Sequence, residues 1–163
     1  LKKLKARYPK IHLIIIGTIK KNGHTKRLID NLGIEQNVTF KSNISKAEII
    51  QLYSTSSIAI VSSLYEGFGY PVIEAMSCEV PLIATNTASI PELTGKYACL
   101  VEPKNNEAIF KSIIKILSDY DNYKEIAIKG RQHVIEKFNW AKITKEYENI
   151  IYETIKEFKD ADI

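Results

Sequence analysis

One segment of the sequence combines residue types that suit the binding of a diphosphate. It runs from Ser62 to Met76, follows a short β-branched run and leads into a helical pattern. The glycines on either side of Phe68 let the backbone bend and approach a ligand closely. The amides of Gly69, Tyr70 and the first helical turn, together with the helix dipole, form a site for an anion. The segment therefore predicts a phosphate-binding turn.

Two carboxylates bracket this turn. Glu66 lies in the loop before it, and Glu74 lies in the helix after it. A carboxylate accepts hydrogen bonds from both hydroxyls of a vicinal diol, so one glutamate could hold a ribose and the other a hexose. Their spacing alone is no argument for paired acid–base catalysis. Each feature also has an ordinary explanation, because an acidic residue near a helix N-terminus is favoured without a ligand and Phe68 could simply anchor the loop.

The elements around this segment alternate between strands and helices. The apolar run Ile11–Ile16 is typical of a strand buried on both faces of a parallel sheet, and Ile58–Val61 indicates another buried strand. Further short strands are expected at Val38–Phe40, Pro81–Ala84 and Ala98–Val101. Helical patterns lie at His24–Leu32, from Ser45 to about Tyr53, from Pro71 to near Cys78, at Ile90–Thr94, and over about 105–118, 122–137 and 140–159. The alternation predicts an α/β, Rossmann-like parallel sheet with helices on both faces.

Helix-boundary signals and the expected topology locate the candidate loops. Ser45 and Glu48 have the spacing of a capping box, and Gly33 is a plausible helix stop. Pro71 suits the first position of a helix. Since ligands bind at the carboxyl ends of parallel strands, the candidate loops are 17–23, 41–46, 62–70 and 85–90.

Composition narrows the function classes. The chain has 163 residues, 45% of them hydrophobic and 26% charged, and a formal charge of +4, which is typical of a globular domain. Basic residues near the N-terminus indicate a solvated helix face first, and there is no basic–aromatic or zinc-finger pattern for nucleic acid. Cys78 and Cys99 form no metal pattern with the histidines and are expected to be buried free thiols, consistent with the cytoplasm.

The string from Glu66 to Met76 resembles the E-x7-E signature of retaining, GT-B-fold glycosyltransferases of family four. Further matches are Ile15-Ile16-Gly17, Val38-Thr39-Phe40, the segment Thr87–Glu92 and Phe138-Asn139-Trp140, whose tryptophan is expected to pack at a helix junction. The resemblance covers nearly the whole chain and implies the C-terminal half of a GT-B fold. It is specific for the family and weakly specific for the substrate. Ser42 and Glu79-Val80 depart from the family pattern, which usually has glycine at these places.

The resemblance implies a role for each matching residue. Glu74 takes the place of the glutamate that binds the donor ribose, and Glu66 that of the glutamate that contacts the transferred sugar at the catalytic centre. The backbone contacts to sugar, phosphate and base fall at Gly17, Asn43, Ile44, Ser45, Gly67, Phe68, Gly69, Tyr70, Pro71 and Val72. The family's phosphate-binding arginine and lysine, and its acceptor domain, would precede Leu1. Lys20 and Lys21 lie in a suitable loop to reach phosphate in this chain.

The implied activity is transfer of a hexose, with retention, from a UDP- or GDP-sugar to a glycan or lipid-linked acceptor in cell-envelope polysaccharide synthesis. The family needs no metal bound by the protein and no cofactor, because amides and positive charge stabilise the leaving diphosphate. Residues 1–163 are then expected to be a nucleotide-sugar-binding domain, inactive alone, cytoplasmic and open to peripheral membrane association. The alternative is a non-catalytic nucleotide-sugar-binding module. Gly17-Thr18-Ile19-Lys20 lacks the acidic residues of a receiver domain and the glycine motif of a dinucleotide site.

Overall fold

The computed structural model describes residues 1–20 and 23–161. The chain forms two compact units, Leu1–Gln51 and Leu52–Ile163. Each unit is an α/β arrangement with its own parallel sheet.

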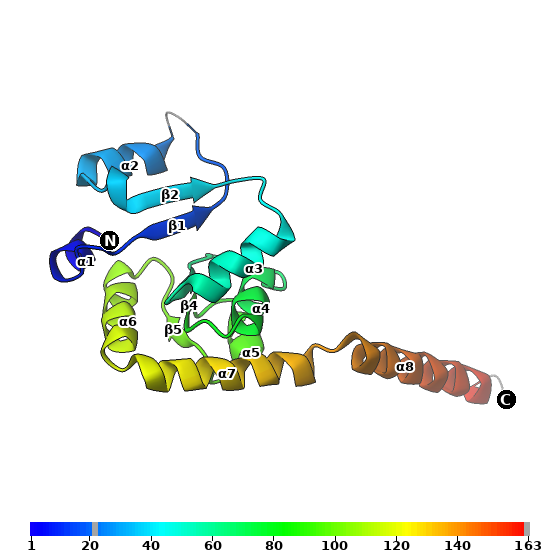
Figure 1. Ribbon diagram of the computed structural model, residues 1–163. Helices are drawn as coiled ribbons and strands as arrows, with labels where there is room; N and C mark the ends of the chain where they lie inside the picture. The colour runs from blue at the N-terminus through cyan, green and yellow to red at the C-terminus, as the bar shows by residue number, and fades with distance from the viewer. Residues whose placement is uncertain (21–22, 162–163) are drawn as a thin grey trace. The chain divides into compact units, whose positions relative to one another are not determined.

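The first unit is built on a pair of parallel strands. It contains α1 (Lys2–Arg7), β1 (Leu13–Ile16), α2 (His24–Leu32), the short 3-10 helix η1 (Glu35–Asn37) and β2 (Val38–Lys41). Leu13 lies opposite Val38, and the register continues to Ile16 opposite Lys41 (Figure 1). Helix α2 has the predicted bounds, and Gly33 ends it with a φ of 64°. The left-handed conformation at Gly33 explains why the helix stops there.

Helix α3 (Lys46–Thr55) connects the first unit to the second, and its start confirms the predicted capping box. The Glu48 carboxylate accepts hydrogen bonds from the Ser45 amide and from the Ser45 hydroxyl, each at 2.8 Å. The Glu48 amide donates back to Ser45 Oγ at 3.3 Å. These bonds hold the pKa of the Glu48 carboxyl below its usual value, with the bond from the Ser45 amide as the largest cause.

The prediction that the first strand is buried on both faces is wrong. Along β1 half-buried residues alternate with exposed ones, and Ile14 and Ile16 are 39% and 45% exposed. In the part of the chain that the structure describes, β1 pairs with β2 alone. An apolar run therefore correctly predicted a strand here but not the number of its covered faces.

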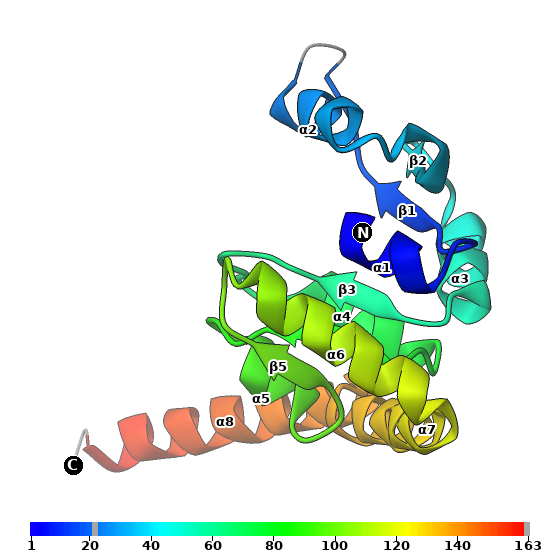
Figure 2. The same cartoon turned by 90° about the vertical axis from the view of Figure 1, so that its left-hand side faces the viewer.

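The second unit contains a three-stranded parallel sheet in the order β3-β4-β5. Its strands are β3 (Ala59–Val61), β4 (Leu82–Thr85) and β5 (Cys99–Val101). Its helices are α4 (Tyr70–Ser77), α5 (Ile90–Thr94), α6 (Asn106–Ser118), α7 (Tyr120–Lys137) and α8 (Trp140–Ala161). Helix α6 packs on β4 and β5 from one face, whereas α4 packs on β3 and β4 from the other (Figure 2). The expected parallel sheet with helices on both faces is confirmed.

The core of the second unit lies between the central strand and α4. All residues of β4 are buried, and Ile83 is fully so. From α4, Val72, Ala75 and Met76 form one cluster with Leu82 and Ala84 of β4, and α7 packs against α4. The residues that follow β3 and β4 are therefore carried by the best-packed part of the chain.

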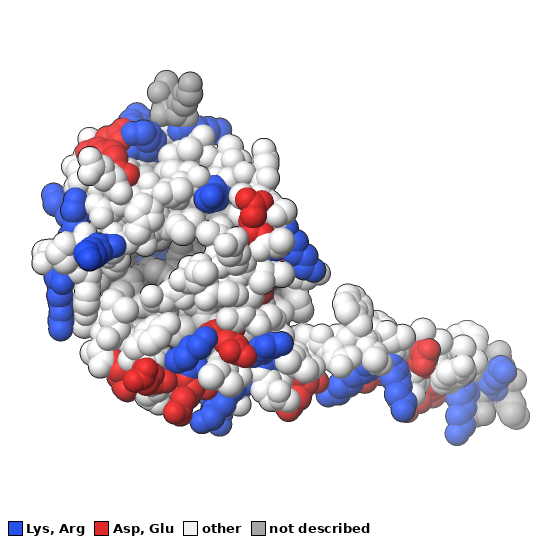
Figure 3. Space-filling model, in the orientation of Figure 1, with Lys and Arg blue, Asp and Glu red and all other residues white. Residues whose placement is uncertain are grey.

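Helix α8 extends from the rest of the second unit (Figure 1). Of its side chains up to residue 159, Ile143 alone is half-buried and the others are exposed. Lys and Glu side chains gather along its lower side in Figure 3. Trp140 is 79% exposed, so the expectation that it packs at a helix junction is wrong. Its neighbour Asn139 instead caps the helix, because its side-chain oxygen accepts a bond from the Ala141 amide at 2.9 Å.

Neither cysteine is as buried as expected. Cys78 and Cys99 are free thiols, and both are half-buried. Partial burial nevertheless raises the pKa of each thiol and is the main cause of the shift. Among the described helices, none combines the length and apolar character needed to cross a membrane.

Candidate functional site

The loop between β3 and α4 reaches its helix through a glycine that no other residue could replace without strain. Gly69 is the N-cap of α4 and has a φ of 95°. A Cβ at this position would lie 2.9 Å from Cδ1 of Leu93, closer than side-chain atoms approach. The helix begins at Tyr70, one residue earlier than predicted, and Pro71 occupies its first turn. The conformation of Gly69 turns the loop sharply into the helix.

The amides of this turn are available to a ligand. In residues 1–20 and 23–161, no oxygen accepts a hydrogen bond from the amides of Gly67, Phe68, Gly69 and Tyr70. Val72 differs, because its amide donates to the Gly69 carbonyl at 3.0 Å and its side chain is fully buried. The open amides thus lie in the loop and at the first residue of the helix. This placement is suited to an anion.

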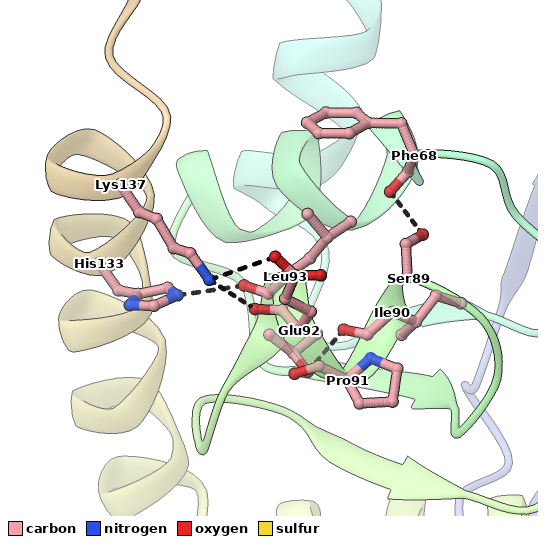
Figure 4. Close-up of polar contacts among 9 residues, drawn as sticks. Phe68, Ser89, Ile90, Pro91, Glu92, Leu93, His133 and Lys137 are labelled. Carbon is pink, nitrogen blue, oxygen red and sulfur yellow. Dashed lines mark hydrogen bonds and ion pairs between the residues drawn. The ribbon is translucent and has the colours of Figure 1, made fainter. Parts of the chain in front are cut away.

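Four carbonyls of the same loop are held by hydroxyls from the last residue of β4 and from the β4–α5 connection. Thr85 Oγ1 donates to the Ser63 carbonyl at 2.6 Å, and Thr87 Oγ1 to the Leu64 carbonyl at 3.2 Å. Ser89 Oγ lies 2.9 Å from the Phe68 carbonyl and 3.2 Å from the Glu66 carbonyl (Figure 4). We call Thr85, Thr87 and Ser89 the hydroxyl ladder. It binds the carbonyls of Ser63, Leu64, Glu66 and Phe68, and it leaves the amides of the turn open.

Helix α5, which follows Ser89, is anchored on α7 (Figure 4). His133 Nε2 lies 3.2 Å from the Leu93 carbonyl, and since a carbonyl only accepts, this nitrogen carries the proton. Lys137 donates to the Glu92 carbonyl at 3.2 Å and pairs with the Glu92 carboxylate at 3.9 Å. These contacts hold α5 at Glu92 and Leu93, and the Leu93 amide in turn donates to the carbonyl of Ser89, the last residue of the ladder.

The two predicted glutamates occupy different surroundings. Glu66 is half-buried and accepts a 2.6 Å hydrogen bond on Oε1 from Ser63 Oγ. Glu74 is exposed on α4, near Tyr53 and Cys78. Burial chiefly, and the Glu74 charge in addition, raise the pKa of Tyr53 to about 12. No lysine or arginine in the described ranges forms an ion pair with either glutamate.

The aromatic side chain between the two glycines both packs and remains accessible. The Phe68 ring lies 5.1 Å from the Tyr70 ring and 5.9 Å from the Phe138 ring, measured between centroids. Phe68 is still 43% exposed and Tyr70 is 69% exposed. Phe68 therefore anchors the loop, as its ordinary explanation held, while part of its ring faces solvent.

The first unit has a hollow at the carboxyl end of its strand pair, with a volume of about 450 Å³. Gly17, Lys20 and His24 line it, and the Gly17 amide donates to the Lys41 carbonyl at 2.8 Å. The predicted role of Lys21 falls on a residue outside those that the structure describes. Gly17 and Lys20 thus flank an open space at the predicted end of the strand.

The predicted base-binding loop follows β2. Ser45 commits both its amide and its hydroxyl to Glu48, so these groups hold the helix start. Asn43 takes a positive φ of 54°, and Ile44 follows half-buried. The structure brings together the predicted residues from Glu66 to Glu74, which all belong to the second unit.

Sequence reasoning missed the residues that order the loop. Ser63 and the hydroxyl ladder were assigned no role, although Thr85, Thr87 and Ser89 recur at every second position directly after a buried strand. That alternation is the signal that could have identified them.

A second hollow of about 350 Å³ lies beside β5, lined by Lys96, Tyr97, Cys99, Lys115 and Tyr123 among others. Tyr123 raises the pKa of Lys115 by a hydrogen bond. No three His, Cys, Asp or Glu side chains in the described parts of the chain gather as a metal site would require.

Comparison with known proteins places this geometry in a family. The sequence profile described as "Glycosyl transferases group 1" matches residues 1–133. The O-antigen chain mannosyltransferase B of Escherichia coli is 31% identical over 122 residues, 75% of this chain and 30% of its own length. The chain spans about a third of the length of the curated relatives it matches.

Two solved structures share the fold. The glycosyltransferase of Rickettsia africae superposes with a TM-score of 0.83 at 30% identity, covering 95% of this chain and 42% of its own. Anabaena HepE, solved in complex with UDP-glucose, superposes with a TM-score of 0.77 at 22% identity, covering 89% of this chain and 42% of its own. The latter comparison bears on the fold alone.

Proposed function

Because the chain belongs to the glycosyl transferases group 1 family, we propose that its second unit binds a nucleoside diphosphate sugar, the donor of a glycosyl transfer. The observation that carries this proposal is the run of open amides from Gly67 to Tyr70 at the start of α4. Four consecutive donors beside a helix N-terminus complement the charge of a diphosphate. The glutamates on either side complement its two sugars.

We assign the roles of the two glutamates from the resemblance of this turn to the E-x7-E signature. Glu74, exposed on α4, accepts hydrogen bonds from the ribose hydroxyls. Glu66, half-buried in the loop, accepts hydrogen bonds from the hydroxyls of the transferred hexose.

The reaction breaks the bond between the anomeric carbon and the diphosphate oxygen, which keeps the electron pair. The acceptor hydroxyl oxygen forms the new bond on the same face and gives its proton to the departing diphosphate oxygen, so configuration is retained. The open amides stabilise the growing charge on the diphosphate, which is electrostatic catalysis. The protein needs no metal for this step.

We propose that the donor is a UDP- or GDP-hexose and that the acceptor is a glycan or a lipid-linked sugar of the cell envelope. The name of the O-antigen relative supports an envelope polysaccharide. The reaction would take place in the cytoplasm, at the inner face of the membrane when the acceptor is a lipid.

Calorimetric titration with UDP, GDP, ADP and their hexose conjugates tests the proposal. We expect selective binding of one nucleotide and at least about tenfold weaker binding by Glu74→Ala, because a hydrogen bond to a charged group contributes about 1.5–3 kcal/mol. Glu148→Ala, which removes an exposed glutamate of α8, is the matched control and should bind as the wild type does. Absence of binding at millimolar ligand, or equal binding by Glu74→Ala, contradicts the proposal.

A further inference from the structure

One of the short side-chain hydrogen bonds of the candidate site joins two residues of the same loop. Ser63 Oγ donates to Glu66 Oε1 at 2.6 Å, in a half-buried position. A hydroxyl–carboxylate bond of this length belongs to the strong, charge-assisted class. It restricts rotation about the last torsion of the glutamate, which otherwise turns freely. The contact therefore fixes which way the carboxylate faces.

Ser63 is itself fixed from the core. Thr85 Oγ1 donates to the Ser63 carbonyl at 2.6 Å, and Thr85 is 1% exposed. Thr85 ends β4, the central strand, which pairs with β3 on one side and β5 on the other. A chain of two hydrogen bonds thus leads from the buried central strand, through Ser63, to the Glu66 carboxylate.

The adjacent serine provides an internal comparison. Ser62 is exposed, and within the described residues its hydroxyl has no hydrogen-bond partner. The two serines are of the same type and adjacent in the loop, so they differ mainly in what their hydroxyls contact. A serine hydroxyl in this loop is therefore not enough to bind Glu66; the position of Ser63 in the loop is what makes the hydrogen bond possible.

We propose that Ser63 is a positioning residue that aims the Glu66 carboxylate at the hexose of the donor, with Thr85 holding Ser63 in place. This inference rests on the proposed function, in which Glu66 contacts the transferred sugar. A carboxylate held in its binding orientation before the ligand arrives loses less conformational freedom on binding. Ser63 therefore acts on the part of the affinity that comes from the sugar.

The test compares the nucleotide that the wild type selects with its hexose conjugate. In Ser63→Ala we expect affinity for the hexose conjugate to fall about three- to tenfold, the effect of one net hydrogen bond, while affinity for the nucleoside diphosphate stays within twofold. Ser63→Thr keeps the hydroxyl and should restore the sugar-dependent gain. Ser62→Ala should match the wild type for both ligands. Equal loss for both ligands in Ser63→Ala, or no loss, overturns the inference.

A second measurement needs no ligand and separates the two proposals. The ¹³C resonance of the Glu66 side-chain carboxyl should shift in Ser63→Ala, return toward the wild-type value in Ser63→Thr and stay unchanged in Ser62→Ala. If these shifts appear but no nucleotide binds, the donor-binding proposal fails while the positioning contact stands. If nucleotides bind but the Glu66 resonance is unmoved by Ser63→Ala, the positioning inference alone fails.

Discussion

The two sheets of this chain give the same sequence signal but have different environments. Leu13–Ile16 and Leu82–Thr85 are both short, mostly apolar runs, and each is followed by a loop that was a candidate for ligand binding. Strand β4 is buried throughout and paired on both sides, whereas β1 alternates between half-buried and exposed residues. Apolar content thus indicates a strand, but the number of covered faces depends on which elements pack against it. In the second unit, the loop between β3 and α4 is held by the hydroxyl ladder, which begins at the last residue of β4.

The largest expected effect lies at the centre of the second sheet. Ile83→Ala should lower the free energy of unfolding by about 2–5 kcal/mol, because it opens a cavity at a fully buried position. Denaturant titration of the variant and the wild type measures the difference. A loss below about 1 kcal/mol would show that β4 is less tightly packed than its burial indicates.

One glycine in a loop of each unit, Gly17 after β1 and Gly69 before α4, sharpens the comparison. Gly69→Ala should cost about 1–3 kcal/mol from its positive φ alone, and more from the contact with Leu93. Gly17, at a φ of 147°, has no atom within 4 Å of the position of a Cβ, so Gly17→Ala carries the backbone strain without the clash. Thermal unfolding of both variants should show the larger drop for Gly69→Ala. The reverse order would contradict the crowding at Gly69.

The same type of substitution in the first sheet should lower the free energy of unfolding much less than Ile83→Ala does in the second. Ile14 is 39% exposed, so Ile14→Ala removes methyl groups that are already partly hydrated. We expect a loss of about 1 kcal/mol or less, measured in the same denaturant series as Ile83→Ala. A loss as large as that of Ile83→Ala would mean that the two strands are equally important to the core, and the comparison would break.

The smallest expected effect appears only at high pH. Tyr53 of the second unit has its pKa raised from 10.0 to about 12, chiefly by burial. The folded state therefore favours the protonated phenol, and this stabilisation is present below pH 10 and is lost as the pH rises toward 12. Tyr53→Phe should show a shallower decline of unfolding free energy over this range than the wild type. Parallel declines would contradict the assigned shift.

Local signals predicted most of the elements, including the turn that carries the candidate site. Gly33 ends α2 where expected, and Ser45 and Glu48 form the expected capping box. The glycine-flanked turn and its two glutamates were likewise identified from residue types. These features depend on neighbours within a few positions, so the sequence contains the information directly.

What could not be predicted depends on contacts between distant segments. The bond from Thr85 to Ser63 joins residues 22 apart in sequence, and the exposure of Trp140 depends on what packs against it. The start of α4 was misplaced by one residue because the positive φ of Gly69 lets Tyr70 enter the helix before Pro71. Patterning is informative about single elements, whereas these outcomes depend on how the elements meet.

Helix α8 has a consequence for how this chain melts. A helix whose side chains up to residue 159 include no buried one gains almost nothing from tertiary packing, so its 22 residues are held by their own backbone bonds. Such a segment unwinds gradually with temperature, as an isolated peptide does. The magnitude of the negative circular dichroism signal at 222 nm should therefore decrease steadily with temperature well before the sharp transition of the sheet. The near-ultraviolet signal should stay constant until that transition begins.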